Sequence, residues 1–549
     1  MQNGQLSRRT FVAGAAAAGT AMAAVSMATA TEVPSSNVPS QWDDEADVVI
    51  VGYGGAGATA SIAVCEAGDS VIVLEKAPED FGGNTGTSSG AAHTAAFADP
   101  DEWISIVKHG CYGTVTDEFV EAVIPQALAT PDWLDSVGVH MNWVETDEGV
   151  TDPTRPSWYK KGFVSGRDGA EGRYLFEELN EVARSWGADV RLGTPAKRLV
   201  QDPQTKEILG VIAENADGDS LAFKARKAVI LACGGYENNP WMQGQFNNPG
   251  IRLFPWGTPY NTGDGFELVS TLGAQLWHMH GLEFSAINFK VPSLEANCSI
   301  STNASDGIQP YNHIFVNQDG LRFMNETKSM NHDIEPKPSL DFDASTSEYK
   351  NLPFYMVFDQ TMFDAAPLWI GSGRTGIVNT YAGVYNATHD DSICDWGGDN
   401  TKALENGWIF KGETLEELAA AMKGTRPCGD EVVGVDAENL QATIEAFNQQ
   451  CADGNDDEFG RAAAKCAPLD NPPYYAIELG FSCINTQGGP RRDEHCRTMN
   501  YANEPIARLY NIGEFGSING YVYVCGNIFE ALWTGRIAGQ HAVTLEPWD

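Results

Sequence analysis

Apolar runs that end in glycine turns dominate the pattern of this chain. Residues 47–51 read Asp-Val-Val-Ile-Val, a nearly continuous apolar run that predicts a fully buried strand of a parallel sheet. The run leads directly into a glycine turn at 52–57 and a helix of small residues at 58–66. A second apolar run, 70–74, ends in Glu75. The pattern therefore predicts a strand–turn–helix–strand unit.

The glycine turn has the GxGxxG spacing of a dinucleotide-binding site. Gly52 permits the tight turn, Gly54 lets backbone N–H groups approach a pyrophosphate, and Gly57 lets the helix lie against the strand. Glu75 ends the second strand, where its carboxylate can accept hydrogen bonds from ribose hydroxyls. Because all these parts occur together, they indicate a bound dinucleotide rather than a turn without a ligand.

Later segments indicate which dinucleotide is bound. A glycine and hydroxyl loop fills 82–90, an apolar run at 227–232 leads into Cys-Gly-Gly, Thr-Gly-Asp-Gly occupies 262–265, and a strand ends in Gly513-Glu514. A cofactor touched by both ends of the chain, without a second GxGxxG for a nicotinamide nucleotide, fits FAD better than NAD.

Composition narrows the classes of partner. The 549 residues carry 74 Asp and Glu against 35 Lys and Arg, for a net charge of −39, so nucleic acid and anionic membranes are poor partners. The 11 cysteines show no CxxC or CxxCH spacing, which gives no support to c-type haem or a zinc site, and no metal ligands are predicted. Their odd number argues against a disulfide scaffold.

The amino-terminal segment resembles a twin-arginine export signal. Arg8-Arg9 precedes an uncharged, alanine-rich run that ends in Ala28-Thr29-Ala30, a small-residue cleavage site. We expect a signal peptide at 1–30, a linker at 31–45, the twin-arginine translocase as a partner, and a periplasmic or other extracytoplasmic location. No later run approaches the ~18 apolar residues that span a bilayer.

The order of the motifs resembles the FAD-dependent family of soluble fumarate reductases, succinate dehydrogenase flavoproteins and 3-ketosteroid dehydrogenases. The resemblance covers residues 46–545 and rests on the glycine segments above, on Glu75-Lys76, on Gly-Leu-Arg-Phe-Met-Asn-Glu at 320–326 and on Gly488-Gly489. It implies an α/β fold, in which a Rossmann-like FAD-binding domain (46–276 and 446–549) is interrupted by an α+β capping domain (277–445).

The resemblance also assigns the cofactor contacts. The covalent flavin histidine of membrane-bound relatives matches Thr85, so FAD is expected to bind non-covalently; His93 lies nearby, off that position. The carboxyl end, 545–549, resembles that of exported cardiac glycoside reductases. The scattered cysteines neither support nor exclude an iron–sulfur cluster. The FAD contacts fall on Gly52, Gly54, Gly55, Ala56, Gly57, Glu75, Lys76, Gly83, Asn84, Thr85, Gly90, Ala196, Asp264, Glu514, Gly526, Asn527 and Ile528.

Departures from the family pattern bear on the substrate. The proton-donating arginine of fumarate reductases reads Met330, and the carboxylate-binding histidine of the HTMGG segment reads Asn485. A second substrate histidine falls near Ser285, and the last carboxylate-binding arginine falls at Val522 or Tyr523. Because a dicarboxylate binds through cations and bidentate arginines, the site is not expected to hold fumarate or succinate well.

Neutral donors take the place of these cations. Tyr521 matches a tyrosine that donates to the substrate ketone in the ketosteroid branch, and Tyr523 and Asn485 are the other candidate catalytic residues. A phenol can polarise a carbonyl as enolate charge develops, although either tyrosine also fits an aromatic packed under the flavin. His332 is a candidate proton donor or an exposed loop histidine.

The sequence thus predicts an FAD-dependent oxidoreductase acting on CH–CH groups. We expect hydride transfer from flavin N5 to a C=C conjugated to a carbonyl of a neutral small-molecule substrate, of the steroid, enone, lactone or enoate type. Electrons would come from a membrane-linked cytochrome or quinol-oxidising donor. A fumarate-like carboxylate reductase, a ketosteroid-type dehydrogenase and a flavin electron carrier without its own reductase activity remain open.

Overall fold

The computed structural model describes residues 38–88, 92–94, 100–145, 160–163, 171–248, 250–251, 253–255, 257–289, 310–327, 337–365, 367–368, 399–521 and 526–548. The predicted signal peptide and most of the predicted linker lie outside these residues. No helix in the part of the chain so described is long and apolar enough to cross a membrane.

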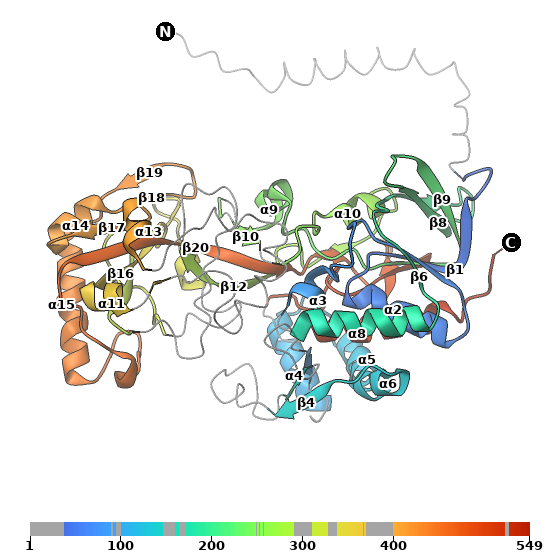
Figure 1. Cartoon of the computed structure of the whole chain (residues 1–549), viewed down its shortest axis with the longest axis horizontal. Coiled ribbons are helices and arrows are strands. Elements are labelled where there is room, and N and C mark those ends of the chain that lie inside the picture. Colours follow the sequence, from blue (N-terminus) through green and yellow to red (C-terminus); the bar gives the residue numbers. More distant parts are fainter. Residues whose placement is uncertain are drawn as a thin grey trace, which may run out of the picture.

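An eight-stranded sheet forms the right-hand part of the molecule in Figure 1. Its main path runs β22-β23-β9-β1-β2-β6, and β8 pairs with both β7 and β9. The neighbouring pairs from β23 to β6 are parallel, which explains why β1 reads as an unbroken apolar run. The strands are β1 (Asp44–Val51), β2 (Val71–Leu74), β6 (Asp189–Arg191), β7 (Ala196–Gln201), β8 (Ile208–Glu214), β9 (Ser220–Leu231), β22 (Arg497–Met499) and β23 (Pro505–Asn511).

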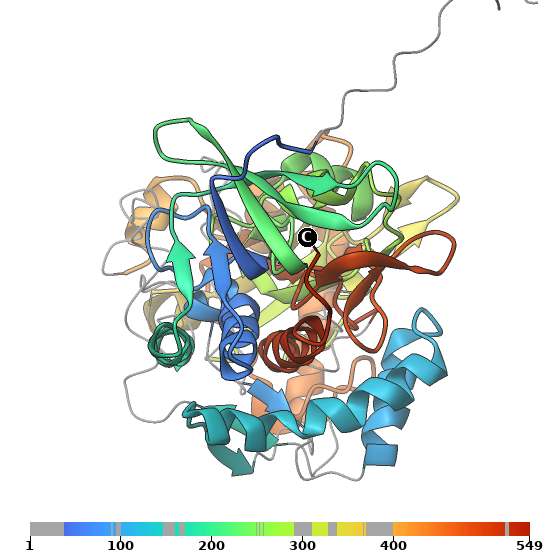
Figure 2. The same ribbon diagram turned by 90° about the vertical axis from the view of Figure 1, so that its right-hand side faces the viewer.

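Three helices lie side by side beneath this sheet: α2 (Gly55–Glu66), α8 (Glu171–Ser185) and α16 (Asn527–Ala542) (Figure 2). The helices α2 and α16 come from opposite ends of the chain and approach closely along small residues. A Cβ atom built on Gly535 would lie 2.6 Å from the Ala56 carbonyl oxygen. Segments from the two ends of the sequence therefore pack against each other under the sheet, at the point where the GxGxxG turn leads into α2.

A six-stranded sheet forms the capping part, on the left in Figure 1. It runs β10-β20-β16-β13, and β12 and β17 also pair with β20. One apolar cluster beneath it includes α14 and α15, and a second cluster covers the other face. The elements are β10 (Leu253–Pro255), β12 (Leu282–Phe289), β13 (His313–Asn317), β16 (Phe354–Asp359), β17 (Ile409–Gly412), α14 (Leu415–Ala421), α15 (Ala437–Asp453) and β20 (Tyr474–Thr486).

The strand β20 extends the capping part beyond the predicted boundary. The boundary at 445/446 falls inside α15, whereas β20 pairs with β16 and β17 and continues to Thr486. The short strand β10, placed by sequence in the first FAD-binding part, also pairs with β20. Strand partners depend on contacts distant in sequence, so the local pattern does not display them. As a result β20 carries its last residues from the cap toward the other sheet.

The remaining elements pack around these two sheets. They are α3 (Gly83–Thr87), β3 (Ala92–Thr94), α4 (Pro100–Cys111), α5 (Asp117–Leu128), α6 (Thr130–Val137), β4 (Asn142–Glu145), β5 (Lys160–Phe163), α9 (Pro240–Phe246), α10 (Asp264–Val269), β11 (Leu276–Trp277), η1 (Lys337–Leu340), β14 (Phe342–Asp343), β15 (Glu348–Tyr349), α11 (Gln360–Ala365), α13 (Thr401–Glu405), β18 (Lys423–Thr425), β19 (Glu431–Val433), η3 (Ala463–Lys465) and β21 (Gly489–Pro490).

We predict that Gly535→Ala lowers the melting temperature. The new methyl group would press on the backbone of α2, and such overpacking costs about 1–3 kcal/mol. Gly244→Ala is the matched control, because Gly244 is also helical and has no atom within 4 Å of its built Cβ. Thermal unfolding of both variants checks this, and equal stability of the two would contradict close packing of α2 and α16.

Candidate functional site

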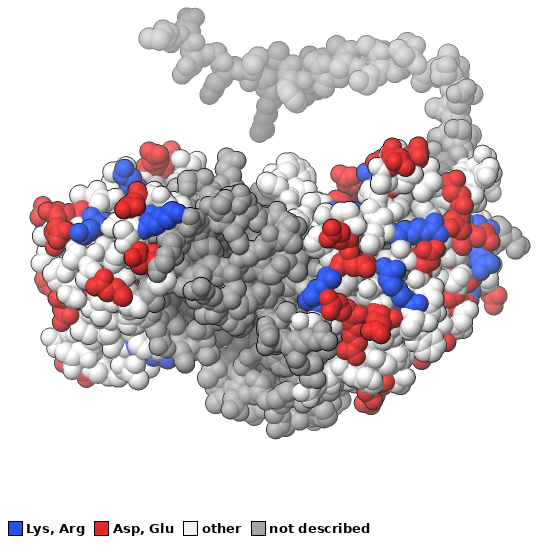
Figure 3. All heavy atoms as spheres, in the orientation of Figure 1, with Lys and Arg blue, Asp and Glu red and all other residues white. Residues whose placement is uncertain are grey.

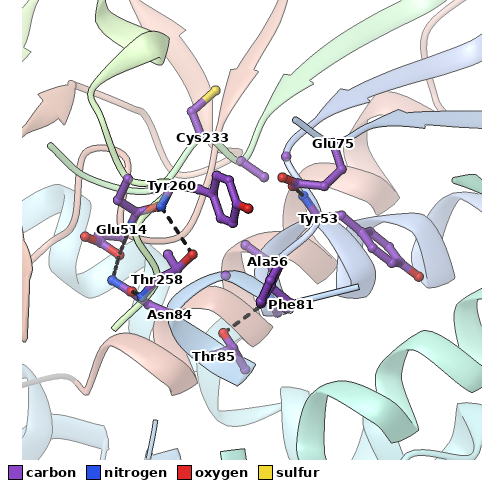
Figure 4. A pocket seen from close by; sticks show the side chains of 18 of the residues that line it. Tyr53, Ala56, Glu75, Phe81, Asn84, Thr85, Cys233, Thr258, Tyr260 and Glu514 are labelled. Carbon is purple, nitrogen blue, oxygen red and sulfur yellow. Dashed lines mark hydrogen bonds between the residues drawn. The ribbon is translucent and has the colours of Figure 1, made fainter. Parts of the chain in front are cut away.

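A cleft lies where the carboxyl ends of β1, β2 and β9 meet the end of β20. Its walls hold about 1440 Å³ of space, with the parts open to solvent included. The lining comes from the GxGxxG turn, α3, the segments after β2, β9 and β23, the start of α16, and the one end of the cap sheet where β12 begins and β20 ends. Figure 4 shows side chains from these distant segments pointing toward one another.

The two glycine loops face each other across one end of the cleft. A Cβ atom built on Gly54 would lie 3.4 Å from the Gly82 carbonyl oxygen, and one on Gly83 would lie 3.4 Å from Cα of Gly54. A Cβ atom on Gly57 would lie 2.1 Å from the Gly52 carbonyl oxygen. Gly57 therefore acts within the turn, while Gly54 and Gly83 leave the cleft wall bare of side chains.

Glu75 is held in position by backbone donors. Tyr53 N donates to Oε2 and Ala77 N donates to Oε1, both at 2.7 Å. Burial raises the pKa of Glu75, and these backbone hydrogen bonds oppose that shift. Lys76 does not pair with Glu75 but bonds to Thr262 Oγ1 at 2.6 Å and forms an ion pair with Asp264. The predicted contacts Lys76 and Asp264 thus bind each other.

Asn84 joins two buried glutamates on the opposite wall. Its Nδ2 donates to Glu237 at 2.8 Å and to Glu514 at 3.1 Å, and its Oδ1 accepts from Thr258 N at 3.0 Å (Figure 4). Asn261 Nδ2 donates to Glu237 at 2.7 Å. Residues from four separate parts of the sequence therefore meet through two amide side chains and two carboxyl groups.

The two glutamates share a proton. Glu237 is fully buried, and both carboxyl groups accept from the same two amide nitrogens, those of Asn84 and Asn261. Two carboxyl groups held this close in a buried wall favour one shared proton. Burial raises the pKa of both groups, and the charge of Glu237 raises the pKa of Glu514 further. The proton therefore belongs to the pair rather than to either residue alone.

The structure places most of the predicted cofactor residues in the cleft lining. Gly57 and Gly526 stand outside that lining, the latter preceding α16, and Gly90 lies outside the described residues. The predicted residues in the lining are Gly52, Gly54, Gly55, Ala56, Glu75, Lys76, Gly83, Asn84, Thr85, Ala196, Asp264, Glu514, Asn527 and Ile528.

Sequence reasoning missed several residues of the wall and its support. Glu237 follows the predicted Cys-Gly-Gly turn by two residues, and its acidic side chain after that turn was the available signal. Thr258, Tyr260 and Asn261 line the cleft just before Thr-Gly-Asp-Gly. No periodicity marks these three residues, because a loop rather than a helix or strand carries them.

Among the predicted catalytic residues, Asn485 lies in the cleft. Its side chain is 3% exposed, and its Nδ2 is buried without a hydrogen-bond partner. Tyr521 is half-exposed outside the cleft lining, with its ring 5.1 Å from that of Tyr112 and 6.5 Å from that of His280. His332 and Tyr523 lie outside the described residues. The catalytic roles of Tyr521, His332 and Tyr523 stay predictions.

The residues present fit an FAD molecule. Glu514 Oε1 is buried in the wall without a hydrogen-bond partner, so it offers an acceptor to a cofactor hydroxyl. The glycine loops and the amino-terminal end of α2 suit a pyrophosphate, and Glu75 suits a ribose. No group of three metal-ligating side chains occurs in the part of the chain that the structure describes.

Comparison with known proteins agrees with this geometry. The model of the family described as "FAD binding domain" matches residues 47–528. The NADH:fumarate oxidoreductase of Klebsiella pneumoniae is 26% identical over 510 residues, which make up 90% of this chain and 47% of that protein. The chain therefore spans about half the length of this relative.

A second relative and a solved structure match over most of their length. The digoxin reductase of Eggerthella lenta is 25% identical over 556 residues, covering 92% of this chain and 89% of that protein. The crystal structure of 3-ketosteroid Δ1-dehydrogenase from Sterolibacterium denitrificans has a TM-score of 0.66 at 20% identity, covering 91% of this chain and 99% of that one. The structural likeness shows a shared fold.

We predict that Glu75→Ala weakens FAD binding to the apoprotein about 10- to 100-fold, because a charged hydrogen-bond acceptor contributes about 1.5–3 kcal/mol. Titration of the apoprotein with FAD, followed by flavin fluorescence, measures this loss. Glu79→Ala is the control, since Glu79 is an exposed acid on the same cleft. Equal affinities of the two variants would contradict a ribose contact at Glu75.

We predict that Glu237→Gln flattens the pH dependence of stability. The raised pKa values of Glu237 and Glu514 stabilise the folded state at low pH, where both groups are protonated. This stabilisation is lost as the pH rises from the ordinary carboxyl pKa of about 4.3 through the raised pKa values of the folded protein. Glutamine mimics a protonated glutamate, so the variant should lose less stability between about pH 5 and pH 9.

Melting temperatures measured across this range for wild type and variant provide the test. Glu79→Gln is the matched control and should keep the wild-type slope, because Glu79 is exposed. An identical slope for Glu237→Gln and wild type would show that the two glutamates do not share a proton.

Proposed function

Because this chain belongs to the FAD binding domain family, we propose that it is an exported reductase acting on a C=C bond conjugated to a carbonyl of a neutral substrate. The predicted family, the FAD cofactor and the class of oxidoreductase acting on CH–CH groups are confirmed. The neutral substrate, the reductive direction and export belong to the proposal.

The composition of the cleft wall carries the proposal for a neutral substrate. Lys76 is the only cation in its described lining, and that lysine is already paired with Asp264. The same lining contains Glu75, Glu79, Asp80, Asp264 and Glu283, and also Glu514, which shares a proton with Glu237. The backbone N–H groups at the amino-terminal end of α2 suit the pyrophosphate of FAD. A dicarboxylate substrate needs cations or a bidentate arginine, and the described lining offers neither beyond the paired Lys76, whereas a neutral carbonyl compound needs none.

Asn485 supplies the donor that such a substrate needs. FAD, when bound, supplies the hydride that is added to the C=C bond. The buried, unpaired Nδ2 of Asn485 is available to donate to a substrate carbonyl oxygen and to stabilise negative charge that develops there. The chain brings this amide to the cleft at the end of β20, so the cap both covers the site and contributes the donor.

A carboxylate reductase is less well supported by these residues. The Klebsiella relative is named for fumarate, and the Eggerthella relative for digoxin. Asn485 replaces the cationic anchor expected for a carboxylate, and no arginine lies in the described lining. These observations favour a substrate without carboxylate charges.

The proposal of export rests on the amino-terminal sequence, and the proposal of an external electron donor rests on the net charge of the chain. The twin-arginine pattern at 8–30 supports transport of the folded flavoprotein. The chain carries a net charge of −39, and acidic side chains are visible over both parts of the molecule in Figure 3, with basic ones among them. Such a surface suits docking of a basic cytochrome or quinol-linked electron donor.

We predict that the reduced flavoprotein is reoxidised by neutral enones, unsaturated lactones or enoate esters. Anaerobic stopped-flow absorbance of the flavin measures the rate for each compound. Asn485→Leu should lower the rate constant with the best substrate about 100- to 1000-fold, the size of effect seen when one preorganised donor is removed. Tyr521→Phe and Tyr523→Phe test the two predicted tyrosines in the same way.

Tyr501→Phe is the control, because Tyr501 is exposed on the surface, and its rate should match the wild type. Reoxidation by fumarate alone, unaffected by Asn485→Leu, would contradict the proposal. The absence of reoxidation by every compound would indicate an electron carrier.

A further inference from the structure

The last turns of α15 and the segment 463–469 run side by side in the capping part (Figure 1). Asn448 fixes one end of this pairing: its Oδ1 accepts from Leu469 N at 2.8 Å, and its Nδ2 donates to Leu469 O at 3.0 Å. At the other end a Cβ atom built on Gly454 would lie 4.0 Å from Cβ of Ala463. The two segments therefore run antiparallel, and every third residue of one lies opposite every third residue of the other.

Cys451 and Cys466 occupy the middle step of this register. Cys451 lies three residues from both Asn448 and Gly454, and Cys466 lies three residues from both Leu469 and Ala463. Both side chains are half-buried against the same apolar cluster, and Cys466 lies close enough to Cys451 to raise its pKa. Helical spacing and loop spacing thus bring the two sulfur atoms together.

The loop between the two cysteines anchors a buried ion network. Arg322 donates to Glu326 at 2.8 and 2.9 Å and to Asp456 at 3.0 Å. Arg461 donates to Glu326 at 3.2 Å and to the His313 carbonyl oxygen at 2.7 Å. The side chains of these four ionised residues are at most 3% exposed.

This network ties the loop between the two cysteines to residues 322 and 326 of the 320–326 motif. Removing one partner of a buried ion pair leaves an uncompensated charge, which is strongly unfavourable. Opening of the loop would pull Asp456 and Arg461 away from Arg322 and Glu326 and thereby loosen the motif. A covalent link across the base of the loop would prevent that opening.

We propose that Cys451 and Cys466 form a reversible disulfide that closes this loop. The Cys466 thiolate attacks a small-molecule disulfide and releases one thiol, and Cys451 then attacks the mixed disulfide and releases the second. The protein loses two electrons and two protons, and the small disulfide gains them as two thiols. The new bond is the single Cys451–Cys466 S–S bond.

Burial, and then the neighbouring Cys466, raise the pKa of Cys451 to about 12. Few Cys451 thiolates therefore exist at neutral pH, which makes Cys451 the resolving rather than the attacking residue. A disulfide that closes a loop of about 15 residues lowers the conformational entropy of the opened loop. By the loop-entropy relation, the opened state then becomes about 100-fold less populated. The link should consequently slow proteolysis within 452–465.

The test uses the FAD-loaded full chain, prepared reduced and then incubated with oxidised glutathione. Alkylation of free thiols followed by mass spectrometry should show two fewer modified cysteines and one linked peptide pair containing residues 451 and 466. Cleavage after the exposed Glu458 by a glutamate-specific protease should become much slower, and the flanking fragments should separate only on a reducing gel.

Cys451→Ser and Cys466→Ser should each abolish the linked peptide and the protection, and Cys428→Ser should abolish neither, because Cys428 is exposed and distant in sequence. Two alkylated thiols at 451 and 466 after oxidation would overturn the proposal. So would glutathione remaining on Cys466, or a linked peptide that joins either cysteine to another residue.

Discussion

The shared proton of Glu237 and Glu514 is the constraint on which the site depends. Two carboxylates cannot both be charged at hydrogen-bond distance in a buried wall without a large energetic cost, so one is protonated and the pair accepts from Asn84 and Asn261. The four residues come from the second glycine loop, the segments on either side of α9 and the end of β23. Their meeting fixes the relative position of these segments.

This polar cluster also links the cap to the cofactor wall. Thr486, the last residue of β20, accepts from Tyr236 N at 2.9 Å and donates to Glu237 at 3.4 Å. Asn485 immediately precedes it, so the same strand end that binds the acid pair presents the unpaired amide to the cleft. A Cβ atom on Gly235 would lie within 2.4 Å of oxygens from Glu237, Glu514 and Thr486. Only glycine therefore allows this convergence.

The sequence predicted the parts of the site that depend on local pattern. The run 47–51 with its GxGxxG turn and Glu75 could be identified because backbone conformation and pyrophosphate binding impose a fixed spacing. Glu237 was not predicted, since its role comes from Asn84, Asn261 and Glu514, all distant in sequence. The reach of β20 past the predicted boundary has the same origin, because its partners β12, β16 and β17 are non-local.

We propose that the cleft wall, with one paired cation in its described lining and a buried amide donor, selects uncharged carbonyl substrates. The most direct measurement compares flavin reoxidation rates for an enoate methyl ester and its free carboxylate, which share the same C=C bond. We expect the ester to reoxidise the reduced protein much faster than the carboxylate does, and Asn485→Leu to remove most of this difference. A faster reaction with the carboxylate would contradict the proposal.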